Sequence, residues 1–259
     1  MLPSAAADAV MNRRIMKCKW KDTALRFRNW AEALLFPQGV TCLACGCAPQ
    51  TELHHGLCES CVAALDALFE KQRRIEQSDP RSIPAELVYV HSAFPYQEPA
   101  RTLIRMLKYQ RVRSAAQPLI EAMAQLPSGE ETVIVPVPTT AKRQKERGFN
   151  QSTLLAHGIG KMLGMQVLDT LVRDGEQRAQ AKLSGEERLN NLTGCMRALQ
   201  RMDGMKVLLV DDVYTSGATA KEAARALLDA GASSVAVFTA ARSIPEEEKP
   251  EFLRRNGYL

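Results

Sequence analysis

The sequence predicts an α/β fold, in which a mostly parallel sheet is flanked by helices and a small metal-binding module precedes it. Two observations predict this organisation. From about residue 85 onward, short runs of β-branched or apolar residues alternate with stretches of helical periodicity. Such alternation favours parallel strands joined by helical crossovers. Ahead of these runs, two Cys-x-x-Cys pairs lie at residues 42–45 and 58–61.

We expect strands and helices in an alternating order along the second part of the chain. The expected strands cover residues 87–93, 132–137, 165–172, 206–210 and 234–240. The expected helices cover residues 101–108, 117–125, 151–162 and 219–230. Gly231 is a C-terminal cap for the last of them.

Length and composition indicate one sizeable domain with an appendage. The chain has 259 residues, of which 46% are hydrophobic and 24% charged, as in globular proteins. A net charge of +5 suits phosphate or nucleic-acid ligands but is also common in proteins that bind neither. No apolar run approaches the roughly 20 residues of a membrane span, and residues 1–10 lack a signal-peptide pattern. We therefore expect a cytoplasmic protein without integral membrane contact.

Composition divides the chain into five parts. They are a basic helical extension at 1–36, a zinc module at 37–70, a polar linker at 71–84, the α/β domain at 85–245 and a tail at 246–259. The extension mixes Lys and Arg with apolar residues at helical spacing. A membrane surface or nucleic acid is one partner for such a helix, but a surface helix that covers the next module is the favoured interpretation.

The cysteine pairs predict a structural zinc site. Four thiolates complete a tetrahedral shell and leave no open position for chemistry. The predicted ligands are Cys42, Cys45, Cys58 and Cys61. Cys47, His54 and His55 are rival ligands for the same ion. A redox pair is the competing interpretation, but neither Cys-x-x-Cys pair follows the strand of a βαβ unit.

The stretch after residue 206 predicts a phosphate site. A buried strand ends at the acid pair Asp211 and Asp212, and ligands of open α/β sheets gather at such strand ends. The next helix begins in small and hydroxyl residues, where unpaired N–H groups and the helix dipole attract phosphate. These residues are Thr215, Ser216, Gly217, Ala218 and Thr219. No Lys follows the glycine, which excludes the phosphate loop of nucleotide hydrolases.

The two adjacent carboxylates limit which phosphate-bearing ligands the site can bind. They would repel a polyphosphate unless they bind sugar hydroxyls or help to neutralise a metal ion, and a ribose 5-phosphate meets both demands. The alternative is that Asp211 and Asp212 cap an ordinary turn. The order of strand, acid pair, hydroxyl loop and helix is much richer than a lone glycine motif, which favours the phosphate site.

Three segments carry a resemblance to a known family. VLLVDDVYTSGAT at 207–219 resembles the phosphoribosyl pyrophosphate motif of type I phosphoribosyltransferases. Together with the cysteine pairs, LIRMLKYQ at 103–110 and VPVPTTAKRQKERGFNQSTLLA at 135–156 resemble the ComF family of competence-associated proteins. The resemblance spans about residues 34–241. It implies a type I phosphoribosyltransferase fold, phosphoribosyl pyrophosphate with Mg²⁺ as ligands, and a role in DNA uptake or in the use of DNA as a nutrient.

The resemblance also assigns expected roles. Asp211 and Asp212 would hold the ribose hydroxyls, and pyrophosphate would leave toward a basic segment, because cations stabilise such a leaving group. That segment contains Lys142, Arg143, Lys145 and Arg147. A solvated basic turn is the alternative for any one of these cations. Lys108 and Tyr109 match the family's Lys-Tyr pair, although Tyr109 is equally typical of packing.

Residues 171–191 correspond in the resemblance to a loop that closes over the active site and excludes water. Gln180 and Arg188 keep the family's spacing there, whereas Gly175 and Gln177 stand where the family has an Arg and a Thr. That departure from the family pattern affects the expectation of phosphoribosyl transfer more than the expectation of ligand binding.

Two functions follow from these residues. The first is a phosphoribosyltransferase with an unidentified acceptor. The second is a non-catalytic module, which senses a phosphoribosyl ligand and binds single-stranded DNA, a DNA-uptake protein or a helicase; a transcriptional regulator on the same scaffold is a further alternative. Fold alone does not choose between them.

Overall fold

The computed structural model describes residues 41–48, 51–78, 83–173 and 194–243. The extension at 1–36, the tail at 246–259, and Gln180 and Arg188 of the expected closing loop lie outside the described residues.

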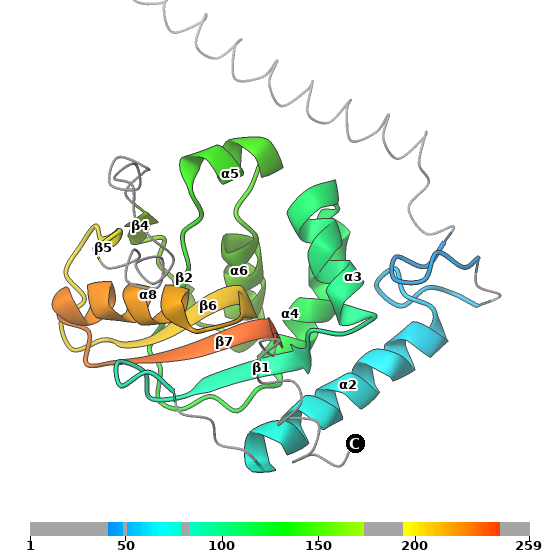
Figure 1. Ribbon diagram of the computed structural model, residues 1–259, viewed down its shortest axis with the longest axis horizontal. Helices are drawn as coiled ribbons and strands as arrows, with labels where there is room; N and C mark the ends of the chain where they lie inside the picture. Colours follow the sequence, from blue (N-terminus) through cyan, green and yellow to red (C-terminus); the bar gives the residue numbers. More distant parts are fainter. Residues whose placement is uncertain (1–40, 49–50, 79–82, 174–193, 244–259) are drawn as a thin grey trace, which may run out of the picture.

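The centre of the structure is a five-stranded sheet in the order β1-β7-β6-β2-β3, with every pair parallel (Figure 1). Its strands are β1 (Val90–Pro95), β2 (Val133–Pro136), β3 (Gln166–Val167), β6 (Lys206–Tyr214) and β7 (Ser234–Arg242). Val207 to Val210 are fully buried because helices cover both faces of the sheet, which explains their continuous apolar run. The predicted α/β fold with a mostly parallel sheet is confirmed.

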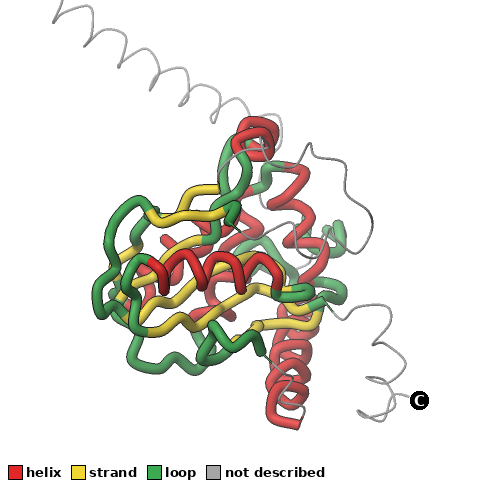
Figure 2. The backbone as a smooth tube through the Cα atoms, turned by 60° about the vertical axis from the view of Figure 1, so that its left-hand side comes forward, coloured by secondary structure: helices red, strands yellow, loops and turns green. Residues whose placement is uncertain are grey.

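Helices lie on both faces of the sheet (Figures 1 and 2). One face is covered by α3 (Ala100–Arg105), α4 (Ala116–Ala124) and α6 (Gln151–Leu163), and the other by α8 (Ala218–Asp229). Successive β6 residues divide between the faces, since Leu208 packs with the first group of helices and Leu209 with α8. A small antiparallel pair, β4 (Leu171–Arg173) and β5 (Met196–Ala198), also packs with α8. None of the helices in the described ranges is long and apolar enough to cross a bilayer.

The segment expected as a linker is partly helical. Helix α2 (Glu59–Ser78) runs eight residues into it, from Lys71 to Ser78. The reason is burial, because Gln72 and Ile75 are buried and Glu76 accepts a hydrogen bond of 2.9 Å from the Ser92 backbone of β1. Residues 71–78 of the expected linker are therefore helical and packed against β1.

Two other elements differ from the sequence prediction. The strand expected at 165–172 is broken into β3 and β4, which belong to different sheets. The basic segment after β2 contains a short helix, α5 (Ala141–Arg147), which begins where Thr140 Oγ1 accepts from Arg143 N and ends at Gly148. The helix has no buried residue, so the sequence shows no apolar periodicity that would predict it.

Candidate functional site

The acid pair, Asp211 and Asp212, lies where β6 extends beyond the end of its neighbour β2. The last β2–β6 pair is Pro136 with Val210, whereas β6 continues to Tyr214 and pairs Asp211 with Thr239 of β7. The sequence prediction that the strand ends at Val210 was thus wrong by four residues. The consequence is a recess above the end of β2, a cavity of about 370 Å³ whose walls include both carboxylates.

Seven of the predicted site residues, including Asp211 and Asp212, line the cavity. Its other walls include Lys108, Arg143, Arg147, Thr215 and Thr219. They also include residues to which the sequence analysis assigned no role: Tyr96, Thr139, Asn150, Gln151, Ser152, Arg173 and Ser243. Asn150 could have been found from the sequence, because Asn is a preferred N-cap residue. It is the N-cap of α6 and accepts a hydrogen bond of 3.1 Å from Ser152 N. No feature of the sequence pointed to the hydroxyl of Ser152, since only the tertiary fold brings residues 152 and 211 together.

Asp211 is the most strongly perturbed acid of the site. Its Oδ1 accepts hydrogen bonds of 2.8 Å from Ser152 Oγ and from the Asp212 backbone N–H. Burial, followed by the negative charge of Asp212, nevertheless raises the pKa of Asp211 to about 7. A ligand that brings positive charge or hydroxyl donors would stabilise the ionised form of such a carboxyl group.

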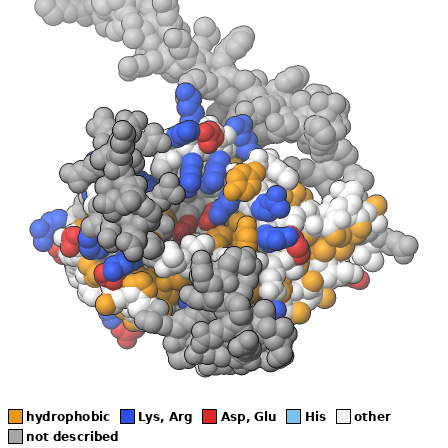
Figure 3. All heavy atoms as spheres, in the orientation of Figure 1, with side chains coloured by type: hydrophobic (Ala, Val, Ile, Leu, Met, Phe, Trp, Pro, Cys, Tyr) orange, Lys and Arg blue, Asp and Glu red, His pale blue; other side chains and the backbone are white. Residues whose placement is uncertain are grey.

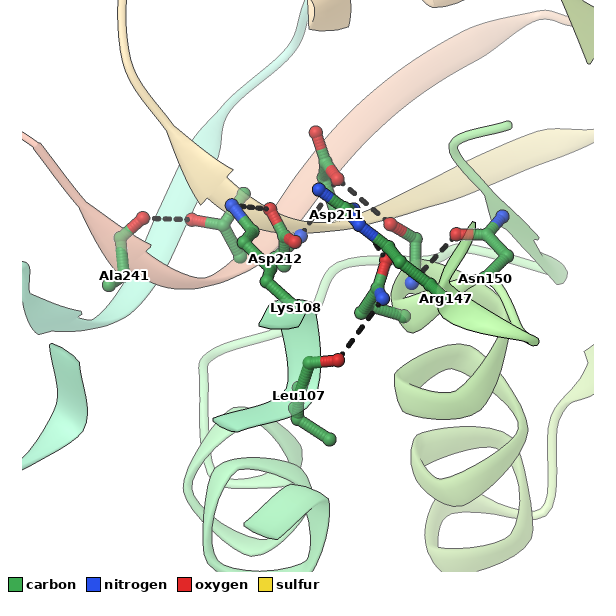
Figure 4. A network of polar contacts seen from close by, with 10 residues as sticks. Leu107, Lys108, Arg147, Asn150, Asp211, Asp212 and Ala241 are labelled. Carbon is green, nitrogen blue, oxygen red and sulfur yellow. Dashed lines mark hydrogen bonds and ion pairs between the residues drawn. The ribbon is translucent and has the colours of Figure 1, made fainter. Parts of the chain in front are cut away.

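Lys108 supplies the positive charge that the acid pair faces in the free protein. Its Nζ lies 2.9 Å from Asp212 Oδ1, and the two side chains are only 19% and 13% exposed (Figure 4). Lys108 belongs to a π-helical turn, Met106–Gln110, which continues α3. Such turns are frequent at functional sites because the extra residue re-aims a side chain.

Tyr109 points elsewhere. It is 70% exposed and is absent from the cavity wall, and the Arg147 guanidinium lies 5.7 Å from its ring centroid. The Lys-Tyr pair of the sequence therefore splits between the cavity and the outer surface.

The loop from Thr215 to Thr219 turns into α8 at Gly217. Gly217 has φ +78° and is the N-cap of the helix. A Cβ at this position would lie 2.3 Å from Tyr214 Oη, so the backbone requires glycine for both its conformation and its space. Thr215 and Thr219 line the cavity, Ser216 is exposed, and Ala218 is the first residue of α8. The loop thus leads directly into the N-terminus of a helix, a position at which anions bind in many proteins.

The basic segment contributes unequally to the cavity. Arg143 and Arg147 line it, and Arg147 Nη1 donates to Gln151 Oε1 at 2.9 Å. Lys142 and Lys145 are exposed on α5 and are not part of the wall. Figure 3 shows Lys and Arg side chains gathered on the face that carries α5 and α3. The cations thus form an inner pair and an outer rim.

The four predicted cysteines come together in the metal module. The sulfur atoms of Cys42, Cys45, Cys58 and Cys61 all lie within 4.8 Å of one another. Cys45 and Cys58 Sγ are 3.8 Å apart, which equals the edge of about 3.8 Å in a tetrahedron with zinc–sulfur bonds of about 2.3 Å. The donor set therefore fits zinc. Four thiolates would leave that ion no open coordination position, so it would stabilise the fold of the module.

The rival ligands take different positions. Cys47 Sγ lies 3.2 Å from Cys45 Sγ, outside the mutually close group of four. Hydrogen bonds from the Cys47 backbone and thiol lower the pKa of Cys45 to about 6, which favours its thiolate. His54 and His55 gather around Glu121 instead of the cysteines.

Comparison with known proteins agrees with this geometry. A family model described as the phosphoribosyl transferase domain matches residues 149–257. The chain is 41% identical over 114 residues to Competence protein ComFC of Bacillus subtilis, a match that covers 43% of this chain and 45% of that protein. It is 32% identical over 164 residues to DNA utilization protein YhgH of Salmonella typhi, covering 59% of this chain and 71% of that protein. The chain belongs to the ComF family. Competence protein F of Haemophilus influenzae is 32% identical over 147 residues, covering 55% of this chain and 61% of that protein.

Membership of the ComF family confirms the resemblance inferred from the sequence motifs. The phosphoribosyl transferase match begins at Phe149, after β1 and β2. The structure shows that those strands, and the turn that carries Lys108, complete the same sheet and cavity. The ComF chain thus combines a phosphoribosyltransferase-like domain with a four-cysteine module.

Proposed function

We propose that this ComF-family protein binds phosphoribosyl pyrophosphate with Mg²⁺ and transfers the phosphoribosyl group to an acceptor. The observation that supports this most is the cavity itself, which unites a carboxylate pair, a phosphate loop and two arginines. The ribose hydroxyls donate to Asp211 and Asp212. The 5-phosphate accepts from the N-terminus of α8 and from Thr215 and Thr219.

Departure of pyrophosphate is the step that the residues support. The acceptor's nucleophile attacks the anomeric carbon as the bond to the pyrophosphate oxygen breaks, and the electron pair leaves with pyrophosphate. Arg143 and Arg147 stabilise the charge that develops on that oxygen. Asp211 and Asp212 would also hold Mg²⁺, which would supply further neutralisation of the leaving group when bound. Lys108 holds Asp212 in place until the ligand arrives.

Calorimetric titration of phosphoribosyl pyrophosphate in the presence of Mg²⁺ tests the binding step. The double variant Asp211→Asn with Asp212→Asn should lose binding, because both hydroxyl acceptors lose their charge. Asp229→Asn is the matched control, since Asp229 is exposed at the last residue of α8. Unchanged affinity in the double variant contradicts the proposal. Release of pyrophosphate on addition of a panel of nucleobases then tests transfer.

We propose a second candidate function, binding of single-stranded DNA without catalysis, on the basis of the outer face. Tyr109 is exposed beside Arg147, and Arg113 lies 4.8 Å from the ring centroid of the neighbouring Phe149. Aromatic rings among cations fit stacked bases and phosphates. The relatives named for competence and DNA utilization add support for a role in DNA uptake or the use of DNA as a nutrient. We propose the cytoplasm as the location of this function and DNA-uptake or helicase proteins as its partners.

This candidate has its own test. Binding of a fluorescent single strand should weaken steeply with salt. Tyr109→Ala should weaken it about 5- to 150-fold, since a stacked base is worth about 1–3 kcal/mol. Leu199→Ala is the control, because Leu199 is another exposed apolar side chain. Equal affinities for Tyr109→Ala and the wild type would rule out this surface. The affinity for phosphoribosyl pyrophosphate should be retained in both variants.

A further inference from the structure

A second group of metal-ligand side chains lies between the four-cysteine module and the α/β domain. The nitrogens of His54 and His55 and a carboxylate oxygen of Glu121 are all within 4.8 Å of one another. His55 Nε2 is 2.8 Å from Glu121 Oε1, and the His54 and His55 rings meet edge to face with centroids 4.3 Å apart. The histidines belong to the module, whereas Glu121 belongs to α4. From this convergence we propose a second metal site, which binds a divalent transition ion of the zinc class.

The backbone of the module holds the histidine rings in place. His54 and Leu57 exchange both backbone hydrogen bonds, at 2.9 and 3.0 Å, and so close a tight turn over residues 55–56. Both central residues have positive φ, +50° at His55 and +80° at Gly56. Hairpin turns of this kind prefer Asn-Gly, so a histidine at the first position is unusual there. A non-glycine residue kept in a sparsely populated backbone conformation is a feature of functional sites.

The carboxylate is oriented from its own helix. Gln117 Nε2 donates to Glu121 Oε1 at 2.8 Å, one turn back along α4. Partners of this type fix a metal-binding carboxylate in the direction of its ion. His54 and Glu121 also line a cavity of about 240 Å³ between the module and α4, which gives an ion room to enter.

The spacing suits zinc with one open position. Zinc bonds to imidazole and carboxylate are about 2.0–2.2 Å long, so neighbouring donors of a tetrahedral site lie about 3.3–3.5 Å apart. The donor distances here are compatible with that value, since one pair is 2.8 Å apart and all three donors lie within 4.8 Å of one another. Small side-chain rotations reach the ideal, because the His55 and Glu121 side chains are 38% and 28% exposed. Two histidines and a glutamate leave the fourth position to water, unlike the four-thiolate site.

An ordinary ion pair explains less of this arrangement. His55 alone would satisfy Glu121, whereas His54 is brought to the same carboxylate. The pair His157–Asp169 shows the plain case: its atoms are 3.4 Å apart, both side chains are 57% exposed, and no third donor completes a metal group among the described residues. An ion held by residues of the module and of α4 joins the two parts of the protein directly.

Metal counting on the full chain tests the proposal. The purified protein is treated with a mild chelator that leaves the thiolate-bound zinc, and Zn²⁺ is then added back under calorimetry and counted by mass spectrometry. The wild type should take up a second equivalent. His54→Ala and Glu121→Gln should bind it at least tenfold more weakly and keep the first. His157→Ala is the matched control and should behave as the wild type.

Three results would overturn the second site. The first is a wild type that binds one equivalent only. The second is a second equivalent that His54→Ala and Glu121→Gln bind as tightly as the wild type does. The third is a second equivalent that disappears in Cys47→Ser, which would place that ion on sulfur instead. Circular dichroism and retention of the first equivalent show that each variant is folded.

Discussion

Replacement of Gly217 by alanine tests the geometry of the phosphate loop. Two separate costs are expected. The left-handed backbone at φ +78° costs a non-glycine residue about 1–2 kcal/mol. In addition, the new methyl group would lie 2.3 Å from Tyr214 Oη. Tyr214 is only 6% exposed, and the Arg242 guanidinium lies 5.1 Å from its ring centroid, so the ring has little room to retreat. Overpacking of this kind costs about a further 1–3 kcal/mol.

Gly164→Ala separates the two costs. Gly164 has φ +69°, but a Cβ there would meet nothing within 4 Å. Both variants therefore carry the conformational cost, and Gly217→Ala alone carries the clash. Urea unfolding should place Gly164→Ala about 1–2 kcal/mol and Gly217→Ala about 2–5 kcal/mol below the wild type. Tyr214→Phe added to Gly217→Ala should recover part of the difference, because it removes the nearest atom.

Affinity for phosphoribosyl pyrophosphate gives an independent measurement. Gly217→Ala should weaken it at least tenfold, since the methyl group displaces the N–H groups that face the phosphate, whereas Gly164→Ala should leave it unchanged. Equal stability and equal affinity in the two alanine variants would refute the reasoning about Gly217.

Three further predictions concern the acid pair, the metal module and a buried carboxylate. In the ligand-free protein, the pKa of Asp211 is raised from 3.8 to about 7, so the folded state holds the additional proton between these values. Its stability should therefore fall as the pH rises through this window and level off above it, and Asp211→Asn should remove that component from urea unfolding measured between roughly pH 5 and pH 8; parallel curves contradict it. Cys58→Ser should lower the zinc content by one equivalent per chain, measured by mass spectrometry, because it opens the thiolate shell, and an unchanged content refutes that site. Glu222→Ala should lower the free energy of unfolding by about 2–4 kcal/mol, because the buried Glu222 carboxylate accepts from the Gly194 and Cys195 backbones and pairs with Arg225 at 3.2 Å. A loss below about 0.5 kcal/mol in urea would contradict this role.

The sequence predicted most of the sheet because its signals are local. The runs around Val133 and Val207 are continuous and apolar since both faces of those strands are buried, and the helices between them keep an apolar periodicity. The loop from Thr215 to Thr219 was predictable for the same reason. Its strand, acid pair, glycine and helix are consecutive in the chain.

Features that depend on tertiary contacts were missed. Helix α5 has no buried residue and carries no apolar face. Strand β6 continues past Val210 only because β7 remains beside it. The contact of Ser152 with Asp211 joins residues 59 positions apart. The site at His54, His55 and Glu121 joins two parts of the chain, and sequence spacing gave no reason to pair them.

Helix α2 gives the metal module a mechanical connection to the sheet. Its 20 residues form a rod of about 30 Å, and Cys61, one of the thiolates, lies in its first turn. The far part of the rod is bonded to the edge strand β1 through Glu76. Because α2 is one continuous helix from Cys61 to Glu76, a force applied to the cysteine pairs is transmitted along it to the edge of the sheet. Optical-tweezer pulling from the two Cys-x-x-Cys pairs should consequently strain β1 directly.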